Sequence, residues 1–379
     1  MGSKQFVLYD RREDCSGCCA CASVCAHGAI RMETDGMGFR YPVIDRDSCV
    51  ECGLCEKVCA FHPVVRNFQP VAEAVRFPDY LSGSQSGGVG YALMRQAVTD
   101  GWVVYGAAMD ADYVVRHRRV VSLEGLEPLR LSKYVQSDMD GIPGQVLKDL
   151  KEGRRVLFTG TPCQCAGVGS LCARYRENLL LVDLICHGVP SPEVWKGFLD
   201  WNASRQSSPV REAVFRDPAL GWHDNRALLA FDSGERIHSD SYFFLFINNM
   251  MSRPSCGRCP FASTQRTSDI TIGDCWGVEQ AAPGFSDDER GCSLVLLHTQ
   301  RGEGFYASVA DAGTHQVMDL TRILQPSLVA PSAPSRWAGR FERDFLRKGF
   351  AFVQARYGKD SLLHRCNLFL QKVKRHLPL

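Results

Sequence analysis

The feature that most limits what this chain can fold into is a pair of cysteine runs near its N-terminus, CSGCCACASVCA and CVECGLCEKVCA. Both runs have the spacing C-x2-C-x2-C-x3-C, and the second follows the first at an offset of 34 residues. In runs of this type three thiolates bind one iron–sulfur cubane and the fourth binds a neighbouring cluster. We therefore predict two [4Fe-4S] clusters, one bound by Cys15, Cys18, Cys21 and Cys59 and the other by Cys49, Cys52, Cys55 and Cys25.

The alternative for these eight cysteines is a pair of zinc sites. Zinc prefers two separated C-x2-C pairs for each ion rather than triplets, which favours the clusters. Both runs end in alanine, Ala26 and Ala60, where such runs usually carry proline, and this departure affects the turn after the fourth ligand rather than any ligand. Cys19 has no counterpart, because the offset aligns it with Gly53, so we expect it to be a packing residue.

The segment between the runs, GAIRMETDGMGFRYPVIDRD, reads as two short strands about a glycine-containing turn. We therefore expect residues 1–65 to form a ferredoxin-like α+β module with two [4Fe-4S] clusters, which relays electrons.

The length, composition and net charge of the chain narrow the class of protein further. The chain has 379 residues, 45% of them hydrophobic, and a net charge of +2, which gives no electrostatic reason to expect nucleic acid as a partner. No signal-peptide pattern and no apolar run long enough for a transmembrane segment occurs, so a cytoplasmic protein is expected. Without a signal sequence, 18 cysteines indicate metal or redox chemistry rather than disulfides.

After a proline-containing linker at 66–80, short apolar runs alternate with helical patterns. Strands are expected within 101–110, 154–160, 178–188, 269–277 and 292–299, and helices within 87–100 and 141–153. This alternation predicts an α/β domain with a mixed sheet over 81–330. The remaining 331–379 is a basic helical tail, either a docking surface or a helix pair packed on the core with its basic side in solvent.

Four more cysteines stand at predicted strand ends or in loops: Cys163, Cys186, Cys256 and Cys259. They could hold a third [4Fe-4S] cluster or a zinc ion, and the spacing does not separate the two; Cys163 and Cys186 could also be buried packing residues. Cys275 is a further candidate ligand for this third site. We expect Cys165, Cys172, Cys292 and Cys366 to be packing residues. His187, next to Cys186, is a candidate proton donor or a hydrogen-bonded structural residue.

Three small residues precede a predicted helix: Ser86, Gly87 and Gly88. They would let backbone N–H groups approach a phosphate, although a serine N-cap with a glycine turn is also common at the start of helices that bind no ligand. Lys133, Gln136 and Gln164 are polar residues near strand ends, for which solvent exposure is the default explanation.

Six ordered motifs resemble the coenzyme F420 hydrogenase/dehydrogenase beta-subunit family, which is similar to the 7-hydroxymethyl chlorophyll a reductases. They are SGGV (86–89), SKYVQS (132–137), GTPCQ (160–164), DLICHGVPSP (183–192), RPSCGRC (253–259) and SDITIGDCWG (268–277), and the resemblance covers about 10–300. It implies an FAD in the α/β domain near Ser86, Gly87, Gly88, Lys133, Gln136, Thr161 and Gln164, beside a cluster held by Cys163, Cys186, Cys256 and Cys259. The family commonly has glycine where this chain has Leu131.

Clusters pass single electrons, whereas reducing an organic bond needs a pair, and a flavin couples the two. Our first hypothesis is an oxidoreductase that takes electrons from reduced ferredoxin or a similar donor and delivers them, as hydride, to a small organic substrate. The second is an electron-transfer beta subunit of a larger hydrogenase or dehydrogenase complex acting on coenzyme F420 or a similar carrier. The third is a zinc-stabilised binding protein. A homo-oligomer is compatible with the sequence, which names no substrate.

Overall fold

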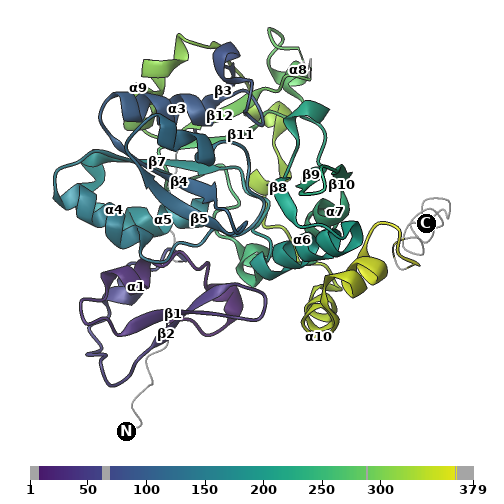
Figure 1. The fold of residues 1–379 in the computed structure, drawn as a ribbon. Coiled ribbons are helices and arrows are strands. Elements are labelled where there is room, and N and C mark those ends of the chain that lie inside the picture. The colour runs from purple at the N-terminus through teal and green to yellow at the C-terminus, as the bar shows by residue number, and fades with distance from the viewer. Residues whose placement is uncertain (1–7, 62–68, 287–288, 363, 365–379) are drawn as a thin grey trace, which may run out of the picture.

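The computed structural model describes residues 8–61, 69–286, 289–362 and 364. Two parts of the chain differ in architecture: a small N-terminal module and a larger domain built on a mixed sheet (Figure 1). The module contains the antiparallel strands β1 (Ile30–Thr34) and β2 (Arg40–Ile44) and the short helices α1 (Ala20–Val24) and α2 (Leu54–Lys57). The expected pair of strands between the cysteine runs is thus confirmed.

The larger domain has an eight-stranded sheet in the order β13-β3-β12-β11-β7-β6-β4-β5. Its strands are β3 (Val71–Arg76), β4 (Val103–Met109), β5 (Val115–Val120), β6 (Val156–Gly160), β7 (Leu179–Leu184), β11 (Ile270–Asp274), β12 (Ser293–Leu297) and β13 (Thr314–Val317). The four neighbours β4, β6, β7 and β11 run parallel, and the pairs at both ends of the sheet are antiparallel. The prediction of an α/β domain with a mixed sheet is confirmed, and the five expected strands all lie within it.

One predicted boundary needs correction. We expected 66–80 to be a linker, but Val71–Arg76 form β3, which pairs with β12 and β13 inside the sheet. Residues 62–68, which include the beginning of that segment, lie outside the described residues.

Helices cover both faces of the sheet. Helices α3 (Val89–Thr99) and α9 (Gln300–Ala310) pack on one face, and α4 (Ile142–Lys151) and α5 (Pro162–Leu171) pack on the other. Figure 1 shows the module below α4 and α5, and α1 contacts both of these helices. The N-terminal module is therefore attached to one particular face of the larger domain.

A second group of elements lies beside the main sheet, to the right in Figure 1. It comprises α6 (Pro192–Gln206), α7 (Ser241–Ile247) and a three-stranded sheet of β8 (Val210–Val214), β9 (Ala227–Phe231) and β10 (Arg236–Ser239). The short helix α8 (Val278–Ala281) packs instead against β3 and β12 of the main sheet. No helix in the described ranges is both long and apolar enough to cross a bilayer.

The basic tail contains α10 (Ala338–Tyr357), which packs on α6. Its apolar residues Phe341, Phe350 and Val353 are buried in the same core cluster as residues of α6 and α7. The segment 365–379 lies outside the described residues. For α10 the structure favours the alternative of a surface helix packed on the core over that of a free docking helix.

Candidate functional site

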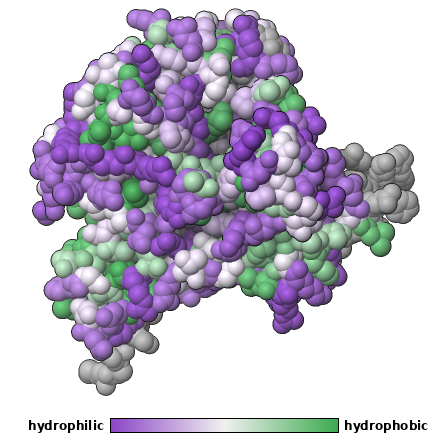
Figure 2. Space-filling view, viewed as in Figure 1, coloured by the Kyte–Doolittle hydropathy of each residue, from purple (hydrophilic) through white to green (hydrophobic). Residues whose placement is uncertain are grey.

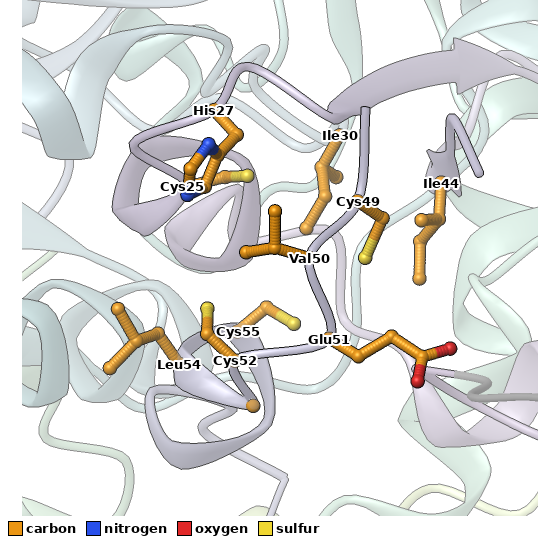
Figure 3. Close-up of a pocket in the computed structure, with 11 residues that line it drawn as sticks. Cys25, His27, Ile30, Ile44, Cys49, Val50, Glu51, Cys52, Leu54 and Cys55 are labelled. Atoms are coloured by element: carbon orange, nitrogen blue, oxygen red, sulfur yellow. The ribbon is translucent and has the colours of Figure 1, made fainter. Parts of the chain in front are cut away.

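Two cavities in the N-terminal module divide its cysteines between them. One is lined by Cys25, Cys49, Cys52 and Cys55, whose sulfur atoms surround a common space in Figure 3. The other is lined by Cys15, Cys18, Cys21 and Cys59, together with Cys19. We call these the outer and the inner cavity. In each cavity the fourth cysteine comes from the opposite run, so the structure brings together the two sets that the spacing predicts, while their binding of iron remains a prediction.

Helices α1 and α2 begin at equivalent positions of the repeat. Cys19 precedes α1 with φ 63° and ψ 8°, and Gly53 precedes α2 with φ 71° and ψ 5°. This left-handed conformation suits glycine and is rare for other residues. The thiol of Cys19 is buried among core residues beneath α4 and α5, and it donates a hydrogen bond to the carbonyl oxygen of Gly17 at 3.4 Å. Cys19 thus has the packing environment that we expected.

The two cavities differ in their surroundings. The outer cavity lies at the surface: Cys52 is exposed, and the neighbouring side chains of Val50 and Leu54 are 58% and 42% exposed. In Figure 2 the module forms the lower-left lobe, where apolar residues are visible among polar ones. In the inner cavity, burial raises the pKa of Cys18 to about 12, so a thiolate is stable there only when a metal ion compensates for the lost solvation.

The third set of cysteines gathers at the carboxyl ends of the parallel strands. Cys163 lies in the first turn of α5, directly after β6, and Cys186 follows β7. Cys256 and Cys259 lie in and directly after the 3-10 helix η6 (Pro254–Arg258). The register pairs Gly160 with Asp183, so the ends of β6 and β7 are level. This is the edge at which open α/β sheets bind ligands.

The four sulfur atoms of this set are mutual neighbours. Burial raises the pKa of Cys186, and the charges of Cys256, Cys163 and Cys259 raise it further. Burial likewise raises the pKa of Cys256 to about 12 and that of Cys259 to about 11. Within the described ranges, no three His, Cys, Asp or Glu side chains meet closely enough to hold a single metal ion. Whether the set holds a cluster or zinc remains open at this point.

The inner cavity and the third set border the same small apolar cluster. Cys18 of the inner cavity and Cys163 and Cys259 of the third set pack together against Ala60, Ala166 and Phe261. Gly167 of α5 makes this approach possible, because a Cβ atom at that position would lie 2.6 Å from Cys18 Sγ. The module and the larger domain therefore meet where their cysteine sets lie.

The predicted phosphate loop lies at the start of α3. Gly88 precedes the helix with φ 87°. Gly87 has no room for a side chain because Val75 and Ser293 lie against it, and the Ser86 hydroxyl donates a hydrogen bond to the carbonyl oxygen of Cys292 at 2.7 Å. The preceding residue, Gln85, was not predicted: its side-chain amide is buried, and in the part of the chain that the structure describes neither of its polar atoms has a partner.

The other predicted cofactor residues have partners within the protein. Lys133 donates hydrogen bonds to the carbonyl oxygens of Pro128, Arg130 and Leu131, and burial lowers its pKa to about 7. Leu131, which replaces the family's glycine, adopts φ 63°, so the backbone keeps a glycine-like conformation without glycine. Gln136 lies at the junction of the two parts of the chain, where its side-chain amide donates a hydrogen bond to the carbonyl oxygen of Ser16 at 3.1 Å.

Thr161 and Gln164 form a capping box at the start of α5. Gln164 also donates to the Ser137 hydroxyl at 2.9 Å, and that hydroxyl is hydrogen-bonded to Nδ1 of the buried His117 at 2.9 Å. These side chains thus support the turn that carries Cys163. Spacing could not reveal His117, which comes from β5.

His187, the candidate proton donor, lies between the third set and α7. Its Nδ1 is 3.3 Å from the Ser332 hydroxyl, and its ring meets Phe246 edge-on at 5.2 Å. Burial lowers the pKa of His187, which favours the neutral imidazole. The role of proton donor stays a prediction.

Arg216, Trp222 and Trp276 form an aromatic and polar group in the larger domain. Arg216 is buried and bonds Asp274 at 2.9 Å and the Tyr134 hydroxyl at 3.0 Å. Trp222 stacks on Trp276 with ring centres 4.5 Å apart. Arg216 therefore has a structural ion pair.

The comparisons with known proteins agree with this arrangement. Residues 14–62 match the family model described as a 4Fe-4S dicluster domain, and residues 153–322 match the one described as the C terminus of the beta subunit of coenzyme F420 hydrogenase/dehydrogenase. A structure of the F420-reducing [NiFe] hydrogenase complex from Methanosarcina barkeri, derivatised with xenon, matches with a TM-score of 0.47 and 17% identity over 79% of this chain and 97% of that one. No curated protein matches the chain.

A dicluster domain joined to a mixed α/β domain defines an iron–sulfur electron-transfer protein of oxidoreductase type. Within that class, residues 153–322 match the domain described as the C terminus of the beta subunit of coenzyme F420 hydrogenase/dehydrogenase. The resemblance read from the six motifs is thereby confirmed.

Proposed function

We propose that this chain is an electron-transfer subunit of a larger hydrogenase or dehydrogenase complex, in which three [4Fe-4S] clusters connect a partner subunit to a flavin, and the flavin to coenzyme F420 or a similar two-electron carrier. The observation that carries the proposal is that Cys18 of the inner cavity and Cys163 and Cys259 of the third set pack against one shared apolar cluster. The proposed path of electrons runs from the outer cavity, where Cys52 is exposed, through the inner cavity to the third set in the larger domain.

The donor sets suit clusters. Each N-terminal cavity is lined by four cysteines in the cubane spacing, and thiolates are the ligands that iron–sulfur clusters require. For the third set we propose a cluster rather than zinc, because Cys163 packs against the same apolar cluster as Cys18. Zinc is redox-inactive, so a zinc ion there could not accept an electron from the inner cluster.

The flavin proposal rests on the start of α3. A helix N-terminus attracts the negative charge of a phosphate, and the buried amide of Gln85 next to it has no hydrogen-bond partner among the described residues. An orphaned buried amide costs free energy unless a ligand satisfies it. FAD held near the loop from Ser86 to Gly88 would supply the exchange between single electrons and electron pairs. The residues of this chain would hold its phosphates and exclude water.

The stand-alone oxidoreductase is the second candidate. The chain carries its own dicluster domain, which would accept electrons from reduced ferredoxin without a further cluster-bearing protein. A small organic substrate would then receive the hydride, and His187 would supply a proton. We propose the cytoplasm as its location in either case, because thiols stay reduced there.

Metal and flavin analysis of anaerobically purified protein tests the proposal. We expect about 12 iron atoms per chain, four per cluster, with equal sulfide and one flavin. A Cys256→Ala/Cys259→Ala variant should lose about four iron atoms and keep the others. Zinc in place of iron, or protein without flavin, contradicts the proposal. Recovery of the native protein with a hydrogenase or dehydrogenase catalytic subunit supports the first candidate, and recovery only as a monomer or homo-oligomer supports the second.

A further inference from the structure

Arg253 is a buried cation at the junction of the two parts of the chain. The residue is 1% exposed. Its Nε donates a hydrogen bond to the carbonyl oxygen of Cys15 at 2.8 Å, and its Nη1 donates to Oε1 of Gln136 at 3.0 Å. Its Nη2 donates to the carbonyl oxygen of Arg40 at 2.8 Å and to Cys15 Sγ at 3.7 Å. One guanidinium thus reaches a predicted cluster ligand directly.

None of these four acceptors is a carboxylate. The guanidinium instead lies over the ring of Tyr41, 4.2 Å from its centre, and 5.4 Å from that of Phe39. Moving an unpaired cation out of water costs several kcal/mol even after relaxation, so such a group needs negative charge nearby. Four thiolates around a [4Fe-4S] core carry a net negative charge, which grows on reduction. The inner cluster would therefore be the missing counter-charge of Arg253.

The same residue also faces the third set. Arg253 begins the turn that carries Cys256, whose backbone N–H donates to the Arg253 carbonyl oxygen at 2.9 Å. Burial raises the pKa of Cys163, and the charge of Arg253 opposes that rise. Arg253 therefore lies between the two sets of cysteines that meet at the junction.

The two cavities have similar linings: neither has a lysine or an arginine among its described lining residues, and each includes one acidic side chain, Glu51 in the outer cavity and Asp14 in the inner one. Arg253 reaches the inner set from outside the cavity lining, through Cys15. The two N-terminal clusters would have equivalent ligands, so a difference in their reduction potentials must come from such surroundings.

We propose that Arg253 raises the reduction potential of the inner cluster above that of the outer one, so that an electron is held on the inner cluster, next to Cys163. The inference rests on the proposed function, because it assumes that both clusters are bound. Its physical basis is that a buried positive charge and an N–H···S hydrogen bond stabilise the more negative, reduced form. Arg253 is a positioning residue, since it acts on the cluster through Cys15.

Arg258 provides a matched control from the same motif. It also reaches the N-terminal module, where its Nη1 donates to Oδ1 of Asp14 at 2.8 Å, but its side chain is 51% exposed. A charge in that position is screened by solvent and already paired with a carboxylate. Its removal should leave both potentials unchanged.

Redox titration followed by electron paramagnetic resonance, with iron content as the check on folding, compares wild type with Arg253→Gln, Arg253→Lys and Arg258→Gln. We expect Arg253→Gln to change the oxidised-to-reduced ratio of one cluster at least tenfold towards the oxidised form, a 59 mV fall for one electron. Arg253→Lys keeps the charge but loses the forked geometry, so it should shift the same cluster by less. Arg258→Gln should match wild type.

An iron-loaded Arg253→Gln variant with unchanged potentials overturns the inference, as does an equal shift in Arg258→Gln or a shift in Arg253→Lys as large as that in Arg253→Gln. If Arg253→Gln loses iron, Arg253→Met, which also removes the charge but keeps an apolar stem, takes its place, and an unchanged potential there overturns the inference as well. If wild type gives no cluster signals, the proposed function is contradicted. If wild type gives cluster signals and the Arg253 variants do not change their reduction potentials, only the role of Arg253 is contradicted.

Discussion

At the scale of single residues, the adjacent thiols of Cys18 and Cys19 have different environments. Both line the inner cavity, but Cys18 packs against the same apolar cluster as Cys163, whereas Cys19 is buried in the core beneath α4 and α5. Cys19 also occupies the left-handed position that Gly53 occupies in the second run. A residue with this backbone is constrained by the turn that starts α1, so its identity need not serve a metal.

We predict that Cys19→Ser keeps both N-terminal clusters and that Cys18→Ser loses about four iron atoms per chain, one cluster. Cys19→Gly should also keep its iron, because glycine adopts φ 63° without strain. Iron and sulfide analysis of the purified variants measures this. Equal iron loss from Cys18→Ser and Cys19→Ser would show that the register of the repeat is wrong.

His117 is a second residue whose environment makes a prediction. Burial lowers its pKa to about 4, and the neutral ring bonds Ser137 and the carbonyl oxygen of Thr159. Between pH 6.5 and 4 the unfolded chain binds a proton at this residue and the folded chain does not, so stability falls as the pH falls through this range. The loss approaches about 3 kcal/mol near pH 4.

The measurement is the difference in thermal stability between wild type and His117→Gln across this pH range, because acid effects on the clusters are common to both proteins. We expect the advantage of wild type to shrink as the pH falls from 6.5 towards 4. A difference that stays constant with pH would mean that His117 titrates normally.

The sequence could predict the ligand sets because cubane ligation imposes fixed local spacing on Cys15, Cys18 and Cys21. It could not predict Arg253 or His117, whose roles depend on elements far apart in the chain. Arg253 lies 238 residues from Cys15, and no local pattern records such a contact.

At the scale of elements, β3 shows why the linker prediction failed. The strand reads VAEAVR, in which two alanines and a glutamate have weak strand propensity. Glu73 is nevertheless buried, because it accepts hydrogen bonds from the Tyr306 hydroxyl at 2.9 Å and pairs with Nδ1 of His315 at 3.0 Å. Both partners lie more than 200 residues away, so tertiary contacts rather than local propensity make this segment a strand.

Helices α4 and α5 provide a matched pair of glycines that face the module. A Cβ atom at Gly167 would lie 2.6 Å from Cys18 Sγ, whereas one at Gly144 would meet Ser23 at 3.7 Å, an ordinary contact. We predict that Gly167→Ala lowers stability by about 1–3 kcal/mol and loses inner-cluster iron, because overpacking displaces Cys18.

Gly144→Ala is the control, and it should keep wild-type stability and iron. Thermal unfolding and iron analysis of the two variants make the comparison. Full iron content and unchanged stability in Gly167→Ala would mean that α5 does not lie as close to Cys18 as described.

At the scale of the whole molecule, the module and the larger domain differ in what stabilises them. The module has one two-stranded sheet and two short helices, and such small units rarely fold without a metal or another support. The larger domain has an eight-stranded sheet with helices and buried apolar cores on both faces.

Removal of iron by anaerobic chelation should therefore loosen the module alone. We expect faster amide hydrogen exchange in β1, β2 and α1, and unchanged exchange in β6 and β7. Reconstitution with iron and sulfide should restore the slow exchange. Equal exchange in the chelated and native proteins would show that the module folds without its clusters.

The shared backbone of Cys19 and Gly53 has one further consequence. A motif duplicated in sequence and conformation is symmetric, and a symmetric pair of cofactor sites cannot by itself prefer one direction of transfer. The two copies differ in what surrounds them: the Cys19 side chain is enclosed by the larger domain, whereas no described residue comes within 4 Å of a Cβ built at Gly53. The direction of electron transfer would then be set by the contacts between the module and the larger domain. The same module attached to a different domain could transfer electrons in the opposite direction.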